Sequence, residues 1–179
     1  NKEIKEKKET QKQIKQNKST QQWLEEYFIN LMTIIEKQVM TKVYTEFNEL
    51  FKHWFDVLIE EEMINARLND EFSPVIEQNG YETEIENLSG GEKTSCALAY
   101  RLALNKVIND VVSTIRTKNL IILDEPTDGF SAEQLDKVRD VLEELDTRQV
   151  VIVSHESKIE SFVENVVNIR KHEHVSTVS

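Results

Sequence analysis

The sequence has few glycines, and this limits the nucleotide sites that the chain can form by itself. Its 179 residues include four, at positions 80, 90, 91 and 129. A phosphate loop of the form G-x-x-x-x-G-K-S/T needs two glycines at fixed spacing before a lysine, and a dinucleotide fingerprint needs three. The four glycines fit neither spacing, so we expect no complete phosphate loop in these residues.

Cysteine and long apolar runs are also scarce. The sequence has one cysteine, Cys96, which excludes an internal disulfide framework and favours a reducing compartment. No run approaches the roughly 20 apolar residues that a membrane span requires, and residues 1–3 do not resemble a signal sequence. We therefore expect a soluble, intracellular chain with no membrane partner.

Charge is distributed unevenly along the chain, whose net formal charge is −11. Residues 1–22 carry seven lysines, three glutamates and neither glycine nor proline, which predicts a long solvated helix with a net charge of +4. From residue 23 onward, Leu24, Phe28, Leu31 and Ile35 follow steps of four and three, the spacing of a coiled-coil seam. We therefore expect a coiled-coil arm and junction helix over residues 1–60 and a compact lobe over residues 61–179.

Eight of the 13 aromatic residues lie between residues 23 and 55. A helix with more than one apolar stripe must be covered on more than one side. One interpretation is that these rings pack against the chain's own compact lobe and a partner coil. The other is that they form a docking surface for another protein, since aromatic residues are enriched at interfaces.

Short alternating segments follow residue 62. They predict strands over residues 64–69, 72–77 and 81–85, and Asn79-Gly80 is a strong hairpin signal. We expect a small antiparallel meander that leads directly into residues 87–92.

Helix and strand patterns then alternate, which predicts an α/β lobe with a mainly parallel sheet flanked by helices. The expected strands cover residues 120–123, 150–153, 166–170 and 175–178, and a short helix is expected around residues 158–162. The apolar run at 120–123 is typical of a strand buried on both faces of a parallel sheet.

Two longer helices complete the predicted lobe. The first runs from residue 91 to about 112, and its expected buried stripe consists of Ala97, Leu104, Ile108 and Val111. The second opens with a capping box at residues 131–134, and the apolar face expected for it consists of Leu135, Val138, Leu142 and Leu145.

Two carboxylates, Asp124 and Glu125, follow the first of the buried strands. Ligands of parallel α/β sheets bind at the carboxyl ends of the strands. A carboxylate there can hold Mg²⁺ through water, and a second can orient or deprotonate an attacking water. We assign the metal role to Asp124 and the water role to Glu125. Taken alone, the pattern also fits a solvated strand end.

Two further features can act on a phosphate. Ser89-Gly90-Gly91 precedes a long helix, whose exposed N–H groups and dipole favour an anion, although a simple helix N-cap explains the same residues. His155 follows the strand at 150–153, where a neutral imidazole can donate to a phosphate and help place water, although a single histidine there can also be incidental.

Together, the three motifs resemble a known superfamily. Leu88-Ser89-Gly90-Gly91-Glu92, then residues 120–127 with Asp-Glu-Pro-Thr at their end, then Val153-Ser154-His155 are similar in order to the signature motif, Walker B strand and switch histidine of ABC-type ATPases. A charged helix stands where transporter subunits of that superfamily carry a phosphate loop. The chain therefore resembles the C-terminal half of the SMC-like group, whose ATPase head is assembled from the two ends of a long chain.

Within that group, Asp-Glu-Pro-Thr after the Walker B strand is similar to the Rad50 family of DNA double-strand-break repair ATPases. The alternatives are a chromosome-structuring SMC clamp head or another ABC-type fragment. The resemblance implies ATP and Mg²⁺ as cofactors, with ATP held between two heads. Ser89, Gly90 and Gly91 would contact the nucleotide of the opposite protomer, while Asp124, Glu125 and His155 would serve their own head.

The resemblance also implies partners. Hydrolysis would require the N-terminal half with its phosphate loop and a second head. An Mre11-type nuclease would dock near the coil, for which the candidate residues are Trp23, Tyr27, Phe28 and Leu31, and the assembled complex would bind DNA in the nucleoid or nucleus.

The resemblance leaves the parts of four residues open between alternatives. The family usually has Leu-Asp where this chain has Phe130-Ser131, so the dimer-loop contact would fall to Asp128 or Ser131. Lys93 and Arg101, two turns apart on the signature helix, are either ordinary surface charges or a relay from ATP to the coils.

Overall fold

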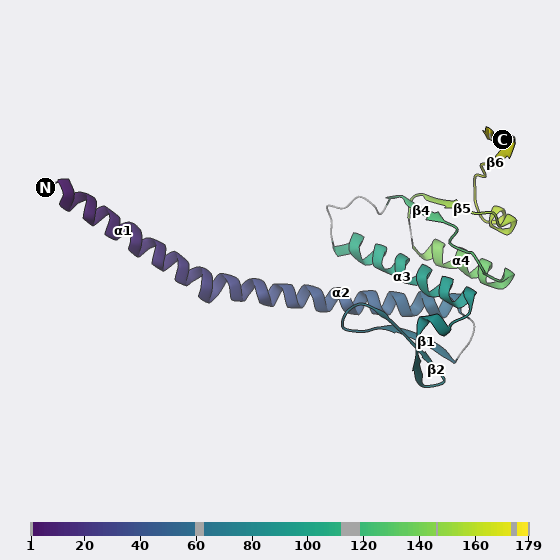
Figure 1. Ribbon diagram of the computed structural model, residues 1–179, viewed down its shortest axis with the longest axis horizontal. Helices are drawn as coiled ribbons and strands as arrows, with labels where there is room; N and C mark the ends of the chain where they lie inside the picture. The colour runs from purple at the N-terminus through teal and green to yellow at the C-terminus, as the bar shows by residue number, and fades with distance from the viewer. Residues whose placement is uncertain (1, 60–62, 112–118, 146, 173–174, 179) are drawn as a thin grey trace. The chain divides into compact units, whose positions relative to one another are not determined.

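The computed structural model describes residues 2–59, 63–111, 119–145, 147–172 and 175–178 (Figure 1). These residues fall into two units, Asn1–Thr45 and Glu46–Ser179. The expected boundary between residues 60 and 61 remains a prediction. Each unit is described by itself.

The first unit is helical, as predicted from its charge pattern. It comprises α1 (Lys2–Trp23), a π-helical turn over Leu24–Phe28 and the first part of α2 (Ile29–Leu58). All the described residues from 2 to 42 are exposed. The π turn was not predicted from the sequence, and because it shifts the phase of the helix, the regular steps of four and three do not form one straight stripe across it.

The aromatic residues divide between the two units. Trp23, Tyr27 and Phe28 are exposed in the first unit, whereas the four rings at positions 47, 51, 54 and 55 are buried in the second. The interpretation that the rings pack against the chain's own lobe is therefore correct for the second set only.

The buried rings form the core that attaches the end of α2 to the lobe. The ring of Tyr100 lies 5.0 Å from that of Phe47 and 5.9 Å from that of Phe51, centroid to centroid. Phe72 also stacks on Phe47, with the ring centroids 6.2 Å apart. Such pairs add specific geometry to a large buried apolar area. The end of α2, the signature helix and the meander therefore share one cluster.

The antiparallel meander is confirmed. It consists of β1 (Ile64–Leu68), β2 (Pro74–Gln78) and β3 (Tyr81–Thr83), with β2 in the middle, and a short 3-10 turn (Ile85–Asn87) follows. Asn79 and Gly80 have φ of 53° and 81°, as a tight hairpin turn requires.

Phe72 was predicted to begin a strand, and this is wrong. It has φ of 61°, in the left-handed region, within the connection between β1 and β2. The Asn69 side chain accepts the backbone N–H groups of Glu71 and Ser73, both at 2.9 Å, which closes the connection into a turn. The Tyr100 hydroxyl donates to the Phe72 carbonyl at 3.0 Å, and this contact from a distant helix is invisible to local sequence patterns.

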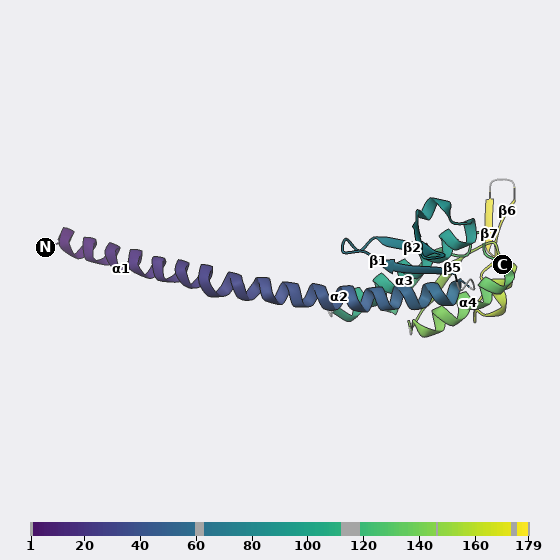
Figure 2. The ribbon, with the colours of Figure 1, turned by 90° about the horizontal axis from the view of Figure 1, so that it is seen from below.

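The α/β part follows the predicted order. It consists of α3 (Gly90–Val111), β4 (Ile121–Asp124), α4 (Ala132–Glu144), β5 (Val150–Val153), a 3-10 helix (Ser157–Ser161), β6 (Ile169–His172) and β7 (Val175–Val178). Strands β4 and β5 pair in parallel, as predicted. The terminal strands form a separate antiparallel hairpin, which Figures 1 and 2 show away from β4 and β5.

The expected buried stripe of α3 is wrong. Ala97, Ile108 and Val111 are exposed and Leu104 is half-buried, while the opposite face of the helix is buried. That buried face consists of Ser95, Cys96, Leu98, Ala99, Leu102, Ala103, Val107 and Asn109. Because α3 is apolar on more than one side, its neighbours decide which side is covered. A smaller shift of the same kind occurs in α4, which buries Val141 instead of Leu142.

The sheet of β4 and β5 is covered on one face only, so the expectation of burial on both faces is also wrong. Ile121 is 7% exposed, but its neighbour Ile122 is 66% exposed. Val151 and Val153 on β5 are likewise exposed, at 39% and 51%. An apolar sheet face is therefore open in the described chain.

The aromatic core gives a stability prediction. Replacing Phe51 by Ala should lower the free energy of unfolding by about 3 to 5 kcal/mol, because the ring is fully buried. The half-exposed Phe28 is the matched control, and its replacement by Ala should change stability little. Urea unfolding followed by Trp54 fluorescence, in a Trp23→Phe background, measures both. Equal effects of the two variants would contradict the packing described.

Candidate functional site

The predicted catalytic pair lies where β4 and β5 end. The parallel register places Asp124 beside Val153, and the Glu125 backbone N–H donates to the Val153 carbonyl at 2.9 Å. His155 comes two residues after the end of β5, and its Nδ1 atom lies 3.0 Å from Oε2 of Glu125. Both side chains are substantially exposed, so a ligand can reach them. The structure thus brings together two residues that are 30 positions apart in the chain.

The Glu125 carboxylate affects the pKa of His155. The hydrogen bond to Glu125, together with its negative charge, raises the pKa of the imidazole. The 3.0 Å contact fits an Nδ1–H group that donates to the carboxylate, which both the neutral and the protonated imidazole can provide. In this arrangement, each side chain holds the other in place, and Glu125 itself has an unusual backbone φ of 44°.

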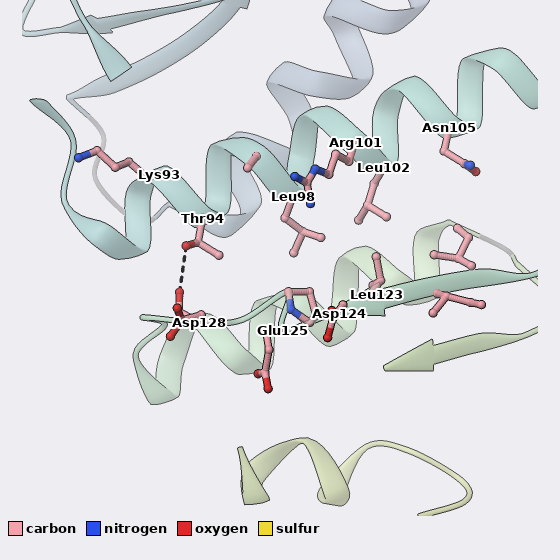
Figure 3. A pocket seen from close by; sticks show the side chains of 14 residues that line it. Lys93, Thr94, Leu98, Arg101, Leu102, Asn105, Leu123, Asp124, Glu125 and Asp128 are labelled. Carbon is pink, nitrogen blue, oxygen red and sulfur yellow. Dashed lines mark hydrogen bonds between the residues drawn. The ribbon is translucent and has the colours of Figure 1, made fainter. Parts of the chain in front are cut away.

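Asp124 is the last residue of β4 and lies on the same edge as Glu125 (Figure 3). Among the residues that the structure describes, no cluster of three or more His, Cys, Asp or Glu side chains could hold a metal. An exposed single carboxylate fits Mg²⁺ when water and phosphate oxygens supply the remaining ligands. Within the described part of the chain, Asp124 therefore fits the predicted water-mediated magnesium site, and no set of side chains fits an all-protein one.

Ser89 caps α3. Its hydroxyl accepts the Glu92 backbone N–H at 3.3 Å, and its own N–H donates to the Glu92 carboxylate at 2.6 Å, which is a capping box. The simpler interpretation of this turn is therefore confirmed. It leaves the phosphate interpretation open, because a side chain added at Gly90 would meet no atom within 4 Å.

The loop after β4 packs against the first turns of α3. The Thr94 hydroxyl donates to the Asp128 carbonyl at 2.9 Å, as the dashed line in Figure 3 shows, and Gly129 adopts φ of 80°. Ser131 then opens α4 with the predicted capping box, in which its hydroxyl accepts the Gln134 N–H at 3.2 Å. The sequence does not reveal how Thr94 and Gln134 join these segments. Thr94 belongs to no motif, and the capping box that contains Gln134 predicts only a local contact with Ser131.

Lys93 and Arg101 line a cavity of about 680 Å³ between α3 and β4. Asp124, Glu125 and Asp128 line the same cavity from the other side. The two predicted relay residues therefore line the same cavity as these three carboxylates, and both are exposed. The candidate docking residues Trp23, Tyr27, Phe28 and Leu31 belong to the first unit, where all four are exposed.

No family model matches the chain, but similar proteins are found among curated sequences. DNA double-strand break repair Rad50 ATPases of Pyrococcus abyssi and Thermococcus kodakarensis are 29% and 30% identical over 140 and 135 residues, or 77% and 73% of this chain. That of Archaeoglobus fulgidus is 37% identical over 102 residues, or 55% of the chain. The chain spans about 15% of the length of the first two proteins and 11% of the third.

Solved structures show the same fold. The Smc head domain with a coiled coil and joint derived from Pyrococcus yayanosii has a TM-score of 0.71 at 20% identity, and the match covers 95% of this chain and 33% of that one. An Smc head domain with an extended coiled coil from Pyrococcus furiosus, bound to the C-terminal domain of ScpA, has a TM-score of 0.64 at 22% identity, covering 99% and 46%.

The order of the motifs, the paired strand ends and these relatives define the class of protein: the chain is a fragment of an ABC-type ATPase. More particularly, it is a C-terminal fragment of the Rad50/SMC-like group. Among the described helices, none is both long and apolar enough to cross a membrane.

The Glu125–His155 pair gives a prediction about pH. Replacing Glu125 by Gln should lower the pKa of His155 toward its ordinary value of 6.5, as NMR titration of the imidazole would measure. Because folding raises this pKa, the pair stabilises the fold fully below about pH 6.5, and the contribution is lost as the pH rises through the raised value.

Glu156 provides the matched control for this titration. Its carboxylate lies 3.8 Å from the other ring nitrogen and contributes less to the shift, so Glu156→Gln should lower the pKa of His155 by less. The geometry is wrong if the Glu125 variant leaves the pKa of His155 unchanged.

Proposed function

We propose that the chain is the C-terminal half of an ATP-hydrolysing DNA double-strand-break repair head. The observation that carries this proposal is the contact between Glu125 and His155 at adjoining strand ends, in a chain whose signature turn precedes both. Glu125 would orient the attacking water, His155 would contact the γ-phosphate, and Asp124 would hold Mg²⁺ through water.

The N-terminal half of the same protein would complete the site. The chain has no phosphate loop, and one apolar face of its parallel sheet is open at Ile122, Val151 and Val153. Parallel sheets are usually covered on both faces, so this face needs a partner. The curated relatives are several times longer than this chain, so proteins of this kind have room for such a half. We propose that the N-terminal half covers this face and brings the phosphate loop.

A second head would supply the remaining contacts. Ser89, Gly90 and Gly91 would meet the nucleotide held by the opposite protomer, with Asp128 or Ser131 in the dimer loop. Since the Ser131 hydroxyl already caps α4, we favour the exposed carboxylate of Asp128. Lys93 and Arg101 would relay closure of the site to the coil, and they line the cavity beside the carboxylates.

The arm would bind other proteins. Its exposed apolar group, formed by Trp23, Tyr27, Phe28 and Leu31, lies in and beside the π turn and is our candidate dock for an Mre11-type nuclease. The repair role follows the printed names of the curated relatives, and DNA would bind to the assembled complex.

Hydrolysis by the completed head tests the main proposal. A head formed from this chain and the N-terminal half should hydrolyse ATP, whereas either half alone should not. Replacing Glu125 by Gln should reduce turnover at least about 100-fold, because it removes the group that activates water. The same variant should accumulate ATP-bound dimers, as light scattering would measure.

Glu160→Gln, an exposed substitution elsewhere in the lobe, is the control and should leave turnover unchanged. If the completed wild-type head fails to hydrolyse ATP and Glu125→Gln shows no additional dimer, the enzyme proposal is wrong and a non-catalytic clamp is favoured.

The open sheet face gives a separate prediction. Replacing Val151 by Lys should weaken association with the N-terminal half by at least about tenfold, because the charge would be buried in an apolar interface. The thermal unfolding of the isolated chain should change little, since the side chain is exposed there. Titration calorimetry measures the association. Val178→Lys, on the separate hairpin, is the control, and equal affinities for the two variants would refute this interface.

A further inference from the structure

The two adjacent glycines of the signature turn lie in different surroundings. A Cβ atom added at Gly90 would meet nothing within 4 Å. One added at Gly91 would lie 3.0 Å from Oε1 of Gln134 and 3.1 Å from the Gly129 carbonyl oxygen. Neither glycine has a left-handed φ, so backbone conformation does not require glycine at either position. The requirement at Gly91 comes from its neighbours.

Those neighbours cannot easily move away. Oε1 of Gln134 accepts the Ser131 backbone N–H at 3.0 Å, and its Nε2 lies 3.5 Å from the hydroxyl of Ser95, which is fully buried. The capping box of α4 therefore holds the Gln134 side chain beneath α3. The Gly129 oxygen belongs to the backbone of a loop that Thr94 ties to α3 through the Asp128 carbonyl.

We propose that Gln134 is a positioning residue that seats the first turn of α3 on the loop after β4. Gly91 is glycine because Gln134 and Gly129 fill the space where a side chain would lie. Gly90 is the position whose backbone stays open to an incoming group. The part of Gly90 depends on the proposed function, whereas the contact of Gln134 with Gly91 does not.

A functional consequence follows from this packing. Two contacts of different kinds join the first turns of α3 to the segments after β4. The Thr94 hydroxyl bonds the loop at Asp128, and Gln134 of α4 lies against Gly91 and Ser95. Ser89 and Gly90 on one segment and Asp128 on the other are therefore held as one unit. We expect the signature turn and the loop after β4 to keep the same relative position when they contact an opposite head. This lowers the entropic cost of docking.

Thermal unfolding of the isolated chain tests the contact without any nucleotide. Gly91→Ala should lower the Tm by an amount on the order of 5 °C, because overpacking strains the neighbours. Gly90→Ala is the matched control and should keep or slightly raise the Tm, since alanine favours helix and meets open space.

A double variant isolates the part of Gln134. Gln134→Ala alone removes half of a capping box, but in the Gly91→Ala background it also relieves the steric conflict. The combined loss of Tm should therefore be clearly smaller than the sum of the two single losses. Additive losses, or a Gly91→Ala variant as stable as Gly90→Ala, would overturn the assignment.

A second measurement tests the positioning role in the completed head. Gln134→Ala should raise the ATP concentration needed for half-maximal dimerisation several-fold, and Gln134→Glu, which keeps the capping acceptor, should recover most of it. Asp140→Ala, an exposed change on the same helix, should have no effect. A Gln134→Ala head that dimerises like the wild type would overturn the role. A wild-type head whose dimerisation does not respond to ATP would refute the proposed function, but it would not affect the conclusion from thermal unfolding.

Discussion

The rest of the site depends on the parallel pairing of β4 with β5. Parallel strands end at the same edge of a sheet, so their register decides which following residues meet. Here Asp124 pairs with Val153, and the Glu125 N–H continues the ladder to the Val153 carbonyl. Glu125 has a left-handed φ of 44°, and its carboxylate lies beside His155. A shift of one residue in the register would separate the pair.

The parts around this pair are joined by short-range contacts. Ser89 and Glu92 of the signature turn form a capping box. Thr94 bonds the loop after β4, and Gln134 connects α4 to α3. The aromatic core around Tyr100 then attaches α3 to the end of α2. These contacts pack the lobe together, but Ile122 and its neighbours leave one apolar sheet face open. The proposed N-terminal half would cover this face.

Much of this arrangement was predictable from local patterns. The charge of residues 1–22, the Asn79-Gly80 turn and the capping box at Ser131 act over a few residues, and each predicted its element correctly. Predictions failed where contacts with distant parts of the chain determine which residues are buried or where a strand begins. The face of α3 that is buried depends on α2 and the meander. Phe72 lies outside its expected strand, where Asn69 closes a turn, Tyr100 donates to the Phe72 carbonyl and Phe47 stacks on the Phe72 ring. Local periodicity carries no information about such partners.

The sequence by itself determined the identity and order of the three motifs, because these are properties of residue type and spacing. It also determined that a phosphate loop is absent from these residues, since four glycines are too few and wrongly spaced. Only the tertiary structure decided that Glu125 meets His155, that Gly91 is packed while Gly90 is open, and that the sheet lacks a cover on one face. These facts depend on contacts between segments tens of residues apart, which form only when the chain folds.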